Sequence, residues 1–212
     1  MRLNLRVSDI HKAYNGAPVL SGCSFSFDDS GIYVLMGQNG SGKSTFLRIC
    51  SLIEAPDRGE VNYFSGTEML KNNIGLKRRI TLVLPNVGVF NSSVFKNIAY
   101  GLRIRGIEKQ KIKEMVEVAL EFVGLSHKRN HDALTLSSGE TQRLGIARAM
   151  VIDPEILFLD EPTASVDEKN TQLIEEIILN MKGKTVVIAT HDMAQAERLS
   201  DRILIIHSGR IS

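Results

Sequence analysis

The stretch IYVLMGQNGSGKSTF, residues 32–46, decides the fold class of this chain. An apolar run of strand length is followed by a glycine-rich loop, and the residues after the loop have helical periodicity. The loop, residues 37–45, fits the pattern G-x-x-x-x-G-K-[ST], whose glycines let consecutive backbone N–H groups turn inward onto phosphate oxygens. The flanking strand and helix favour this interpretation over a glycine-rich turn with a chance lysine. A phosphate-binding strand–loop–helix unit is therefore predicted within an α/β fold.

The residues of this loop have distinct predicted roles. The start of the following helix adds roughly half a positive charge to the site. Lys43 is expected to reach the β- and γ-phosphates, and the hydroxyl of Ser44 is a candidate ligand of Mg²⁺. The residues predicted to bind the nucleotide here are Gly37, Asn39, Gly40, Ser41, Gly42, Lys43, Ser44 and Thr45.

Two carboxylates follow a second apolar run, in EILFLDEP, residues 155–162. Ligands of open α/β sheets bind at the carboxyl ends of the strands, so Asp160 and Glu161 are placed beside the phosphate loop. Asp160 is predicted to hold Mg²⁺ through water, and Glu161 to act as the general base that deprotonates the attacking water. His191 directly follows another apolar run, TVVIAT, and its imidazole is predicted to contact the γ-phosphate.

Apolar runs without alternation recur along the chain, which is typical of parallel strands covered on both faces. These runs are 32–36, 80–84, 155–160, 185–190 and 202–207. Helical periodicity covers 43–53, 112–123 and 173–181. Strands that alternate with helices predict a three-layer α/β fold with a mostly parallel sheet.

Two regions depart from this alternation. The first ~30 residues are predicted to form short strands with a turn at Asn15-Gly16, giving a small antiparallel flank. Between residues 86 and 150 helix dominates and no strand is evident in the sequence. We interpret this region as a helical subdomain inserted within a single domain that spans 1–212.

Composition excludes several classes of protein. The 26 basic and 24 acidic residues leave a net charge of +2, too even to favour nucleic acid or an anionic membrane surface as a partner. Cys23 and Cys50 lie among apolar residues and are predicted to be reduced, buried thiols. No apolar run approaches the ~18 residues that span a bilayer, so we expect a soluble chain that works at a membrane only beside another chain.

A second glycine-containing stretch, LSSGETQR at residues 136–143, opens a predicted helix far from the phosphate loop. The hydroxyl of Ser137 is a candidate phosphate ligand, and Gly139 permits close backbone approach to an anion. The positive end of the following helix would add to the attraction. In isolation, the same residues would indicate only a serine N-cap at the start of a surface helix.

Together these motifs resemble the ATP-binding-cassette ATPases, the nucleotide-binding subunits of ABC transporters, from about Tyr14 to Gly209. GQNGSGKST resembles the Walker A motif of that family, ILFLDE its Walker B motif, and LSSGE its L-S-G-G-Q signature. SVD at 165–167 resembles the D-loop, and His191 matches the switch histidine. Tyr14 matches the aromatic residue that stacks on adenine.

The resemblance implies a P-loop NTPase fold of the RecA-like kind, with ATP and Mg²⁺ as cofactors. It also implies a head-to-tail dimer, either a homodimer or a pairing with a second ATPase subunit. Each ATP would then lie between the loop of Lys43 in one chain and Ser137 and Gly139 in the other. Such subunits are cytoplasmic and peripheral on the inner face of the cell membrane, bound to polytopic permease subunits.

Two segments depart from the family pattern. In LSSGE, Ser138 replaces the first signature glycine and Glu140 replaces the glutamine, which places a negative charge near the helix start. Pro85 stands where the family has a glutamine that touches Mg²⁺ and the attacking water, and proline has no side-chain donor or acceptor. Asn86 is a candidate for partial replacement. We therefore predict weak basal ATPase activity.

The leading hypothesis is an ATPase subunit that drives a membrane transporter. VFKNIAYGLRIRG, residues 94–106, resembles the same stretch of importer subunits, including those for tungstate and related oxyanions. The alternatives are a soluble ABC ATPase without a transport role and an ATP-gated dimerisation module, which the loss of glutamine at Pro85 keeps open.

Overall fold

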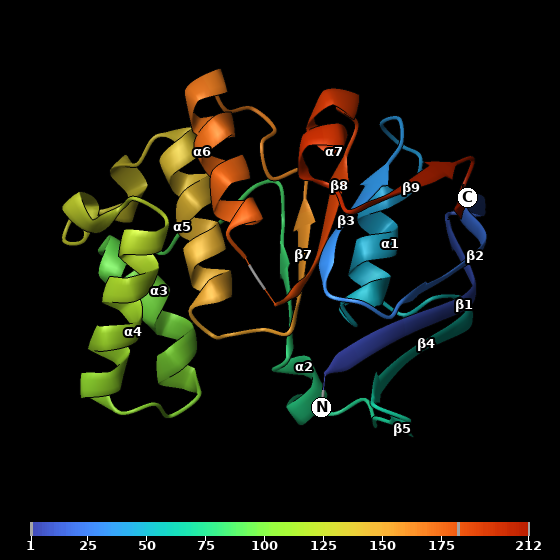
Figure 1. Ribbon diagram of the computed structural model, residues 1–212, viewed down its shortest axis with the longest axis horizontal. Coiled ribbons are helices and arrows are strands. Elements are labelled where there is room, and N and C mark those ends of the chain that lie inside the picture. Colours follow the sequence, from blue (N-terminus) through green and yellow to red (C-terminus); the bar gives the residue numbers. More distant parts are fainter. Residues whose placement is uncertain (1, 182, 212) are drawn as a thin grey trace. The chain divides into compact units, whose positions relative to one another are not determined.

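The chain passes back and forth between two compact units (Figure 1). The computed structural model describes residues 2–181 and 183–211. The first unit comprises Met1–Leu82, Glu155–Glu161 and Met181–Ser212, and the second comprises Val83–Pro154 and Pro162–Asn180.

A six-stranded sheet with the order β10-β9-β3-β8-β7-β6 is the centre of the α/β architecture. Its strands are β3 (Gly31–Met36), β6 (Ile80–Val83), β7 (Ile156–Asp160), β8 (Thr185–Thr190), β9 (Arg202–His207) and β10 (Arg210–Ile211). Strand β3 pairs in parallel with β8 and β9, β7 pairs in parallel with β8, and β10 is antiparallel to β9. The predicted mostly parallel sheet is confirmed.

Two of the predicted strands differ in detail from the expectation. Strand β9 is covered on one face only, because Ile203 and Ile205 are 38% and 46% exposed while Leu204 and Ile206 are buried. Its apolar run therefore reflects a half-exposed strand near the sheet edge, not one covered on both faces. Strand β6 ends at Val83, one residue earlier than predicted.

The first residues form part of a second sheet with the order β2-β1-β4-β5. Its strands are β1 (Leu3–Tyr14), β2 (Ala17–Phe27), β4 (Arg58–Ser65) and β5 (Glu68–Met69). Asn15 and Gly16 have φ of 52° and 80°, the left-handed conformations of a tight hairpin turn, as the sequence predicts. The strands of this hairpin have 12 and 11 residues, longer than expected, and β4 and β5 were not predicted.

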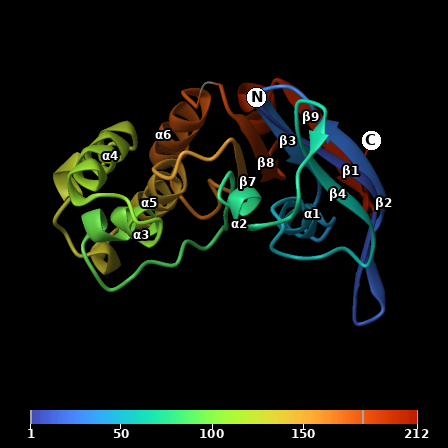
Figure 2. The same cartoon turned by 90° about the horizontal axis from the view of Figure 1, so that it is seen from below.

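Helix α1 (Lys43–Cys50) contacts β7 and β8 of the large sheet and β2 of the second sheet (Figures 1 and 2). Its apolar residues join the core of the first unit, where Cys23 and Cys50 are free, buried thiols as predicted. The prediction that this helix reaches Ile53 is wrong. Leu52 has a φ of 60°, which ends the helical path, and Ile53 is 65% exposed. The first unit also contains α2 (Ile74–Lys77) and α7 (Met193–Leu199), and α7 packs against β3 and β8.

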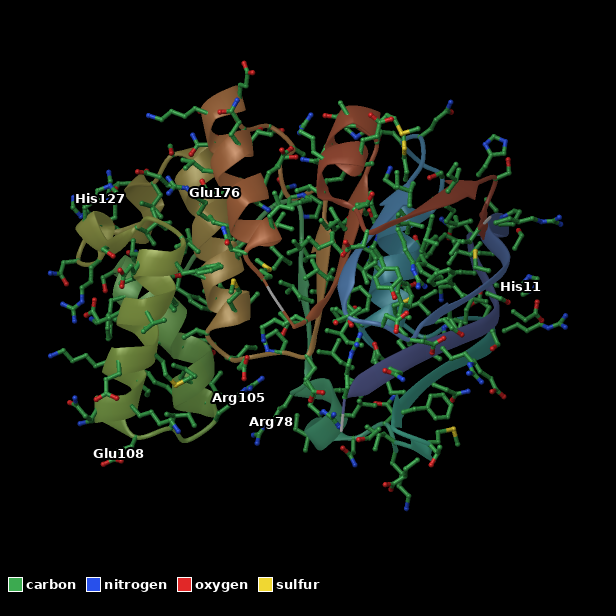
Figure 3. The ribbon with its side chains drawn as sticks, in the orientation of Figure 1. His11, Arg78, Arg105, Glu108, His127 and Glu176 are labelled. Atoms are coloured by element: carbon green, nitrogen blue, oxygen red, sulfur yellow. The ribbon has the colours of Figure 1, made fainter. Side chains whose placement is uncertain are left out.

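The second unit is built from helices, which Figure 2 shows grouped together. These are α3 (Val94–Ile104), α4 (Lys109–Phe122), α5 (Ser138–Met150) and α6 (Glu168–Leu179), with short 3₁₀ turns at η1 (Ser126–Lys128) and η2 (Ala133–Thr135). Helix α5 contacts α3, α4 and α6, and most of its residues are buried. Glu108 is the N-cap residue of α4, and His127 lies in η1, which follows the C-terminal end of α4 (Figure 3). Helix α6 begins five residues earlier than its apolar periodicity indicates, because the carboxylate of Asp167 caps it by accepting from the N–H of Asn170.

Candidate functional site

The predicted site residues of the first unit gather at one edge of the six-stranded sheet. The parallel strands β3, β7 and β8 end side by side, and Asp160 at the end of β7 lies opposite Ala189 of β8. The phosphate loop at 37–45 follows β3, while Glu161 and His191 directly follow β7 and β8. Strand pairing thus places three separate segments of the chain around one point.

The phosphate loop carries the features of an anion cradle. Gly42 has a φ of 104°, which suits glycine, and it is the N-cap of α1, where no side chain competes for the first amides of the helix. The hydroxyl of Ser41 is buried and has no hydrogen-bond partner among the described residues. Lys43 is 5% exposed, and its ammonium donates to the carbonyls of Gly37 at 2.8 Å and Gln38 at 3.2 Å. The ammonium of Lys43 is therefore held by backbone carbonyls of its own loop.

Glu161 lies between the two predicted catalytic partners. One of its carboxylate oxygens is 3.3 Å from the ammonium of Lys43, and Nδ1 of His191 is 3.0 and 3.1 Å from the two oxygens. Glu161 has a φ of 48°, and its N–H donates to the carbonyl of Ala189. The left-handed conformation is energetically costly for a non-glycine residue. The contacts of Glu161 at the sheet edge therefore offset the cost of this backbone conformation. A cavity of about 390 Å³ beside this cluster is lined in part by Gln38, Asn39, His191, Met193 and His207.

Asp160 and Ser44 form the second pair of the site. The hydroxyl of Ser44 donates to Oδ1 of Asp160 at 3.0 Å, and Asp160 is 2% exposed. Burial raises the pKa of the Asp160 carboxyl above its ordinary value. Within residues 2–181 and 183–211, no cluster of three or more His, Cys, Asp or Glu side chains is placed to bind a metal. One hydroxyl and one carboxylate are nevertheless the oxygen donors that suit Mg²⁺, which keeps waters and phosphate oxygens as its other ligands.

Tyr14 ends β1, in the same unit as the phosphate loop. The residue is 40% exposed and so is accessible to a planar ligand. Its hydroxyl donates to Oε1 of Glu54 at 2.6 Å, a contact between residues 40 positions apart that no sequence pattern marks.

The LSSGE segment lies in the second unit and forms a complete capping box. The hydroxyl of Ser137 accepts from the N–H of Glu140 at 3.3 Å, and the carboxylate of Glu140 accepts from the N–H of Ser137 at 2.9 Å. That carboxylate is also 3.5 Å from the ammonium of Lys128, and the pKa of Glu140 is lowered, chiefly by the bond from Ser137. The negative charge of Glu140 is thereby turned back onto the helix start, while Ser138 is exposed.

Gly139 has a packing role that the sequence did not indicate. A Cβ at this position would lie 2.3 Å from Cγ and 2.6 Å from Cβ of Asn170 in α6. Asn170 in turn donates from Nδ2 to the carboxylate of Asp167 at 2.8 Å. The absence of a side chain at Gly139 therefore allows α5 to approach α6, next to the segment that resembles the D-loop.

Pro85 and Asn86 follow β6 in an irregular segment of the second unit, where Pro85 is half-buried and Asn86 is exposed. The side chain of Val87 fills the space beside Gly145 of α5, because a Cβ on Gly145 would lie 2.5 Å from Cγ2 of Val87. The segment that carries the unusual proline is thus packed on the helix that follows LSSGE.

Arg148 of α5 adds a polar connection to the same segment. Its guanidinium donates to the carbonyl of Gly88 at 2.5 Å and lies 4.9 Å from the ring centroid of Phe90. The N–H and carbonyl of Phe90 are both bonded to the carboxamide of buried Asn97. Sequence reasoning missed these contacts, because none of them follows a local periodicity.

Comparison with known proteins places this geometry in a family. Residues 20–164, more than half of the chain, match the sequence profile of the ABC transporter family. The chain belongs to the ABC transporter family. It is 41% identical over 212 residues to the tungstate uptake system ATP-binding protein TupC of Peptoclostridium acidaminophilum, covering 99% of this chain and 97% of the relative. It is 34% identical over 222 residues to the phosphate import ATP-binding protein PstB 2 of Natronomonas pharaonis, covering 98% and 78% of the two chains.

The fold of this ABC subunit is also that of a solved relative. The cbiO1 structure from Clostridium perfringens, described as part of the ABC transporter complex cbiONQ, matches with a TM-score of 0.86 and 27% identity over 98% of this chain and 86% of that one. The predicted P-loop NTPase fold, the ATP-binding function and the ATPase activity are confirmed. In the described part of this ABC subunit, no helix has both the length and the apolar character needed to cross a bilayer.

Proposed function

We propose that this ABC ATPase hydrolyses ATP at the edge of the six-stranded sheet, between the phosphate loop at 37–45 and the side chains that follow β7 and β8. The observation that carries the proposal is the cluster of Lys43, Glu161 and His191, joined by contacts of 3.3 and 3.0 Å. Three groups with complementary charge and proton-transfer chemistry meet beside an anion cradle there.

Each group of this cluster has one task in hydrolysis. The loop amides and Lys43 bind the β- and γ-phosphates, so Lys43 exchanges its contacts with Glu161 and the loop carbonyls for phosphate oxygens. Glu161, once released, orients the attacking water and accepts its proton. His191 holds the Glu161 carboxylate through Nδ1 and is proposed to contact the γ-phosphate. The exposed ring of Tyr14 stacks on the adenine base.

Ser44 and Asp160 are proposed to hold Mg²⁺, Ser44 directly and Asp160 through water. The metal would neutralise the charge of the β- and γ-phosphate oxygens. The buried setting of Asp160 supports this role, because a carboxylate with a raised pKa gains from a cation beside it.

The complete site is proposed to require two chains arranged head to tail, either a homodimer or a pairing with a second ATPase subunit. Ser137 and Gly139 would then face the γ-phosphate held by the phosphate loop of the other chain. The capping box supports this arrangement, since it fixes the start of α5 and turns the carboxylate of Glu140 onto the helix start. Binding of ATP would close the two chains and hydrolysis would let them part.

We further propose that residues 1–212 form a single ABC ATPase domain in which about 86–150 is the helical subdomain. The domain would act at the cytoplasmic, inner face of the cell membrane, bound to polytopic permease subunits, with no role for nucleic acid. Its cargo is proposed to be an oxyanion such as tungstate. The 41% identity with a tungstate uptake subunit over nearly the full length of both chains supports this cargo, and the similarity to a phosphate import subunit supports an oxyanion in general.

Uptake of radiolabelled oxyanions by intact cells tests the proposal. Cells that lack this chain should lose tungstate uptake, and the native chain should restore it while Lys43→Ala should not. Molybdate, sulfate and phosphate serve as parallel substrates. Purification of the chain from membranes should also recover polytopic subunits. If none is recovered, and uptake of all four oxyanions is unchanged without the chain, a non-transport ATPase or an ATP-gated dimerisation module is the better description.

A further inference from the structure

The side chain of Tyr14 is held in a network of polar contacts. Its hydroxyl donates to Oε1 of Glu54 at 2.6 Å, a distance typical of a hydrogen bond to a charged acceptor. The same carboxylate oxygen lies 3.3 Å from the ammonium of Lys12. The side chains of Tyr14 and Lys12 in β1 thus contact the same oxygen atom of Glu54, which lies in a distant segment.

Glu54 is placed by the end of the phosphate-loop helix. The carbonyl of Arg48 in the last turn of α1 accepts from the N–H groups of Ile53 and Glu54, after the chain has turned at Leu52 with a φ of 60°. The position of the Glu54 carboxylate is therefore set by the same helix whose first turn begins at Lys43.

Lys12 of β1 also binds the segment that contains Glu54. Its ammonium donates to the carbonyl of Ala55 at 2.9 Å and to Oδ1 of Asp57 at 3.1 Å, while Oδ2 of Asp57 accepts from the N–H of Ala13 at 2.8 Å. The N–H of Asp57 also donates to the carbonyl of His11, the β1 residue labelled in Figure 3. The hydrogen bond to Asp57 raises the pKa of Lys12, so the ammonium is charged at neutral pH.

The ammonium of Lys12 also lies over the Tyr14 ring, 5.7 Å from its centroid. A cation near one face of an aromatic ring is attracted by that face and occupies it. Tyr14 is 40% exposed, so it is also accessible to a planar ligand.

We propose that Glu54 is a positioning residue for the nucleotide base, because it holds the Tyr14 ring in one orientation before the nucleotide arrives. This inference rests on the proposed function, which places the base on Tyr14. Lys12 assists by holding the Glu54 segment and by covering the ring face that the base does not use. The phosphate-loop helix thereby sets both ends of the nucleotide site, the phosphates through Lys43 and the base through Glu54.

The energetic reason is preorganisation. A tyrosine at the end of a strand has rotamer freedom that is lost when a base stacks on it, and this loss weakens binding. The bond to Glu54 removes that freedom in advance. The loss of one such restraint corresponds to about a three- to tenfold weaker affinity.

Equilibrium titration of the full chain with ATP and with inorganic tripolyphosphate tests the proposal, because tripolyphosphate lacks a base. Glu54→Ala should raise the Kd for ATP about three- to tenfold and leave the Kd for tripolyphosphate unchanged. Glu54→Gln should retain most of the affinity, since its carboxamide oxygen still accepts from the tyrosine hydroxyl. Tyr14→Phe should match Glu54→Ala, and the double variant should be no weaker than either single variant.

Glu68→Ala is the matched control, because Glu68 is an exposed glutamate of β5 in the same unit. An equal loss of tripolyphosphate affinity in Glu54→Ala would indicate general damage to the site and overturn the proposal. An unchanged Kd for ATP in Glu54→Ala, with Tyr14→Ala impaired, would overturn it while leaving the proposed function intact. If the native chain binds ATP no more tightly than tripolyphosphate, the placement of the base on Tyr14 is itself wrong.

Discussion

The carboxylate of Glu161 lies 3.3 Å from the ammonium of Lys43, so the proposed general base contacts the proposed phosphate-binding cation. Both side chains are largely buried, with 17% and 5% exposure. Water screens such a contact poorly, and phosphate oxygens must compete with the carboxylate for the lysine. We therefore expect nucleotide binding to be linked to release of the Glu161 carboxylate from Lys43.

Replacement of Glu161 by glutamine should separate binding from turnover. We expect Glu161→Gln to lower ATP turnover about 10²–10⁴-fold, the contribution of a positioned base. The same variant should bind ADP more tightly than the native chain, because the neutral side chain no longer competes for Lys43. Turnover is measured by phosphate release and ADP affinity by calorimetry, with exposed Glu197→Gln of α7 as the control. Native turnover in Glu161→Gln would show that another group is the base.

Pro85 offers a gain-of-function prediction. Pro85→Gln should raise basal ATP turnover about tenfold, since one added hydrogen bond to the attacking water is worth about 1.4 kcal/mol. Asn86→Ala should lower the turnover of the native chain and have less effect in Pro85→Gln, if Asn86 partly replaces the missing glutamine. Steady-state ATPase assays at saturating ATP measure both effects. An unchanged or reduced rate in Pro85→Gln would contradict the prediction of weak basal activity.

Gly139 should be intolerant of any side chain for a structural reason. Gly139→Ala places a methyl group 2.3 Å from Cγ of Asn170, so we expect a loss of about 3 kcal/mol in the free energy of unfolding. For a chain of this length, that corresponds to a fall in Tm of roughly 6–12 °C. Asn170→Gly removes the opposing side chain. Calorimetry should therefore show that Asn170→Gly lowers the free energy of unfolding less in the Gly139→Ala variant than in the native chain. Additive losses would argue against this contact.

The buried carboxylate of Asp160 is expected to lower stability at neutral pH and yet to be required for Mg²⁺-dependent nucleotide binding. Because burial raises its folded-state pKa above 3.8, the folded protein binds this proton more tightly than the unfolded chain. The free energy of unfolding should therefore fall as pH rises from about 3.8 through the raised pKa, and the penalty should persist at neutral pH. Asp160→Asn should remove the penalty and raise the Tm at pH 7, while it abolishes Mg²⁺-dependent nucleotide binding. Thermal melts from pH 4 to 8, with and without Mg-ATP, test both effects. A Tm at pH 7 equal to or below that of the native chain would contradict the assignment.

Much of the phosphate site was predictable from the chain alone. Buried parallel strands leave unbroken apolar runs, and the residue after each run lies at the ligand-binding edge. The sequence therefore predicts that Lys43, Asp160, Glu161 and His191 lie together, because local chain order and strand direction specify that edge.

Contacts between distant segments were not predictable in the same way. The bond from Tyr14 to Glu54, the approach of Gly139 to Asn170 and the packing of Val87 on Gly145 each join residues whose local sequence is compatible with several neighbours. Helix ends are also hard to predict where a single backbone conformation, as at Leu52, ends an otherwise apolar pattern.

The sequence by itself determined the family, the parallel sheet and the chemical groups of the site, because these depend on the periodicity and order of residues along the chain. Only the tertiary structure decided that Glu161 rests on Lys43, that Glu140 turns back onto Ser137, and that Glu54 holds Tyr14. Side-chain direction depends on which surfaces pack together and on which charges are thereby removed from water, and these are properties of the folded molecule.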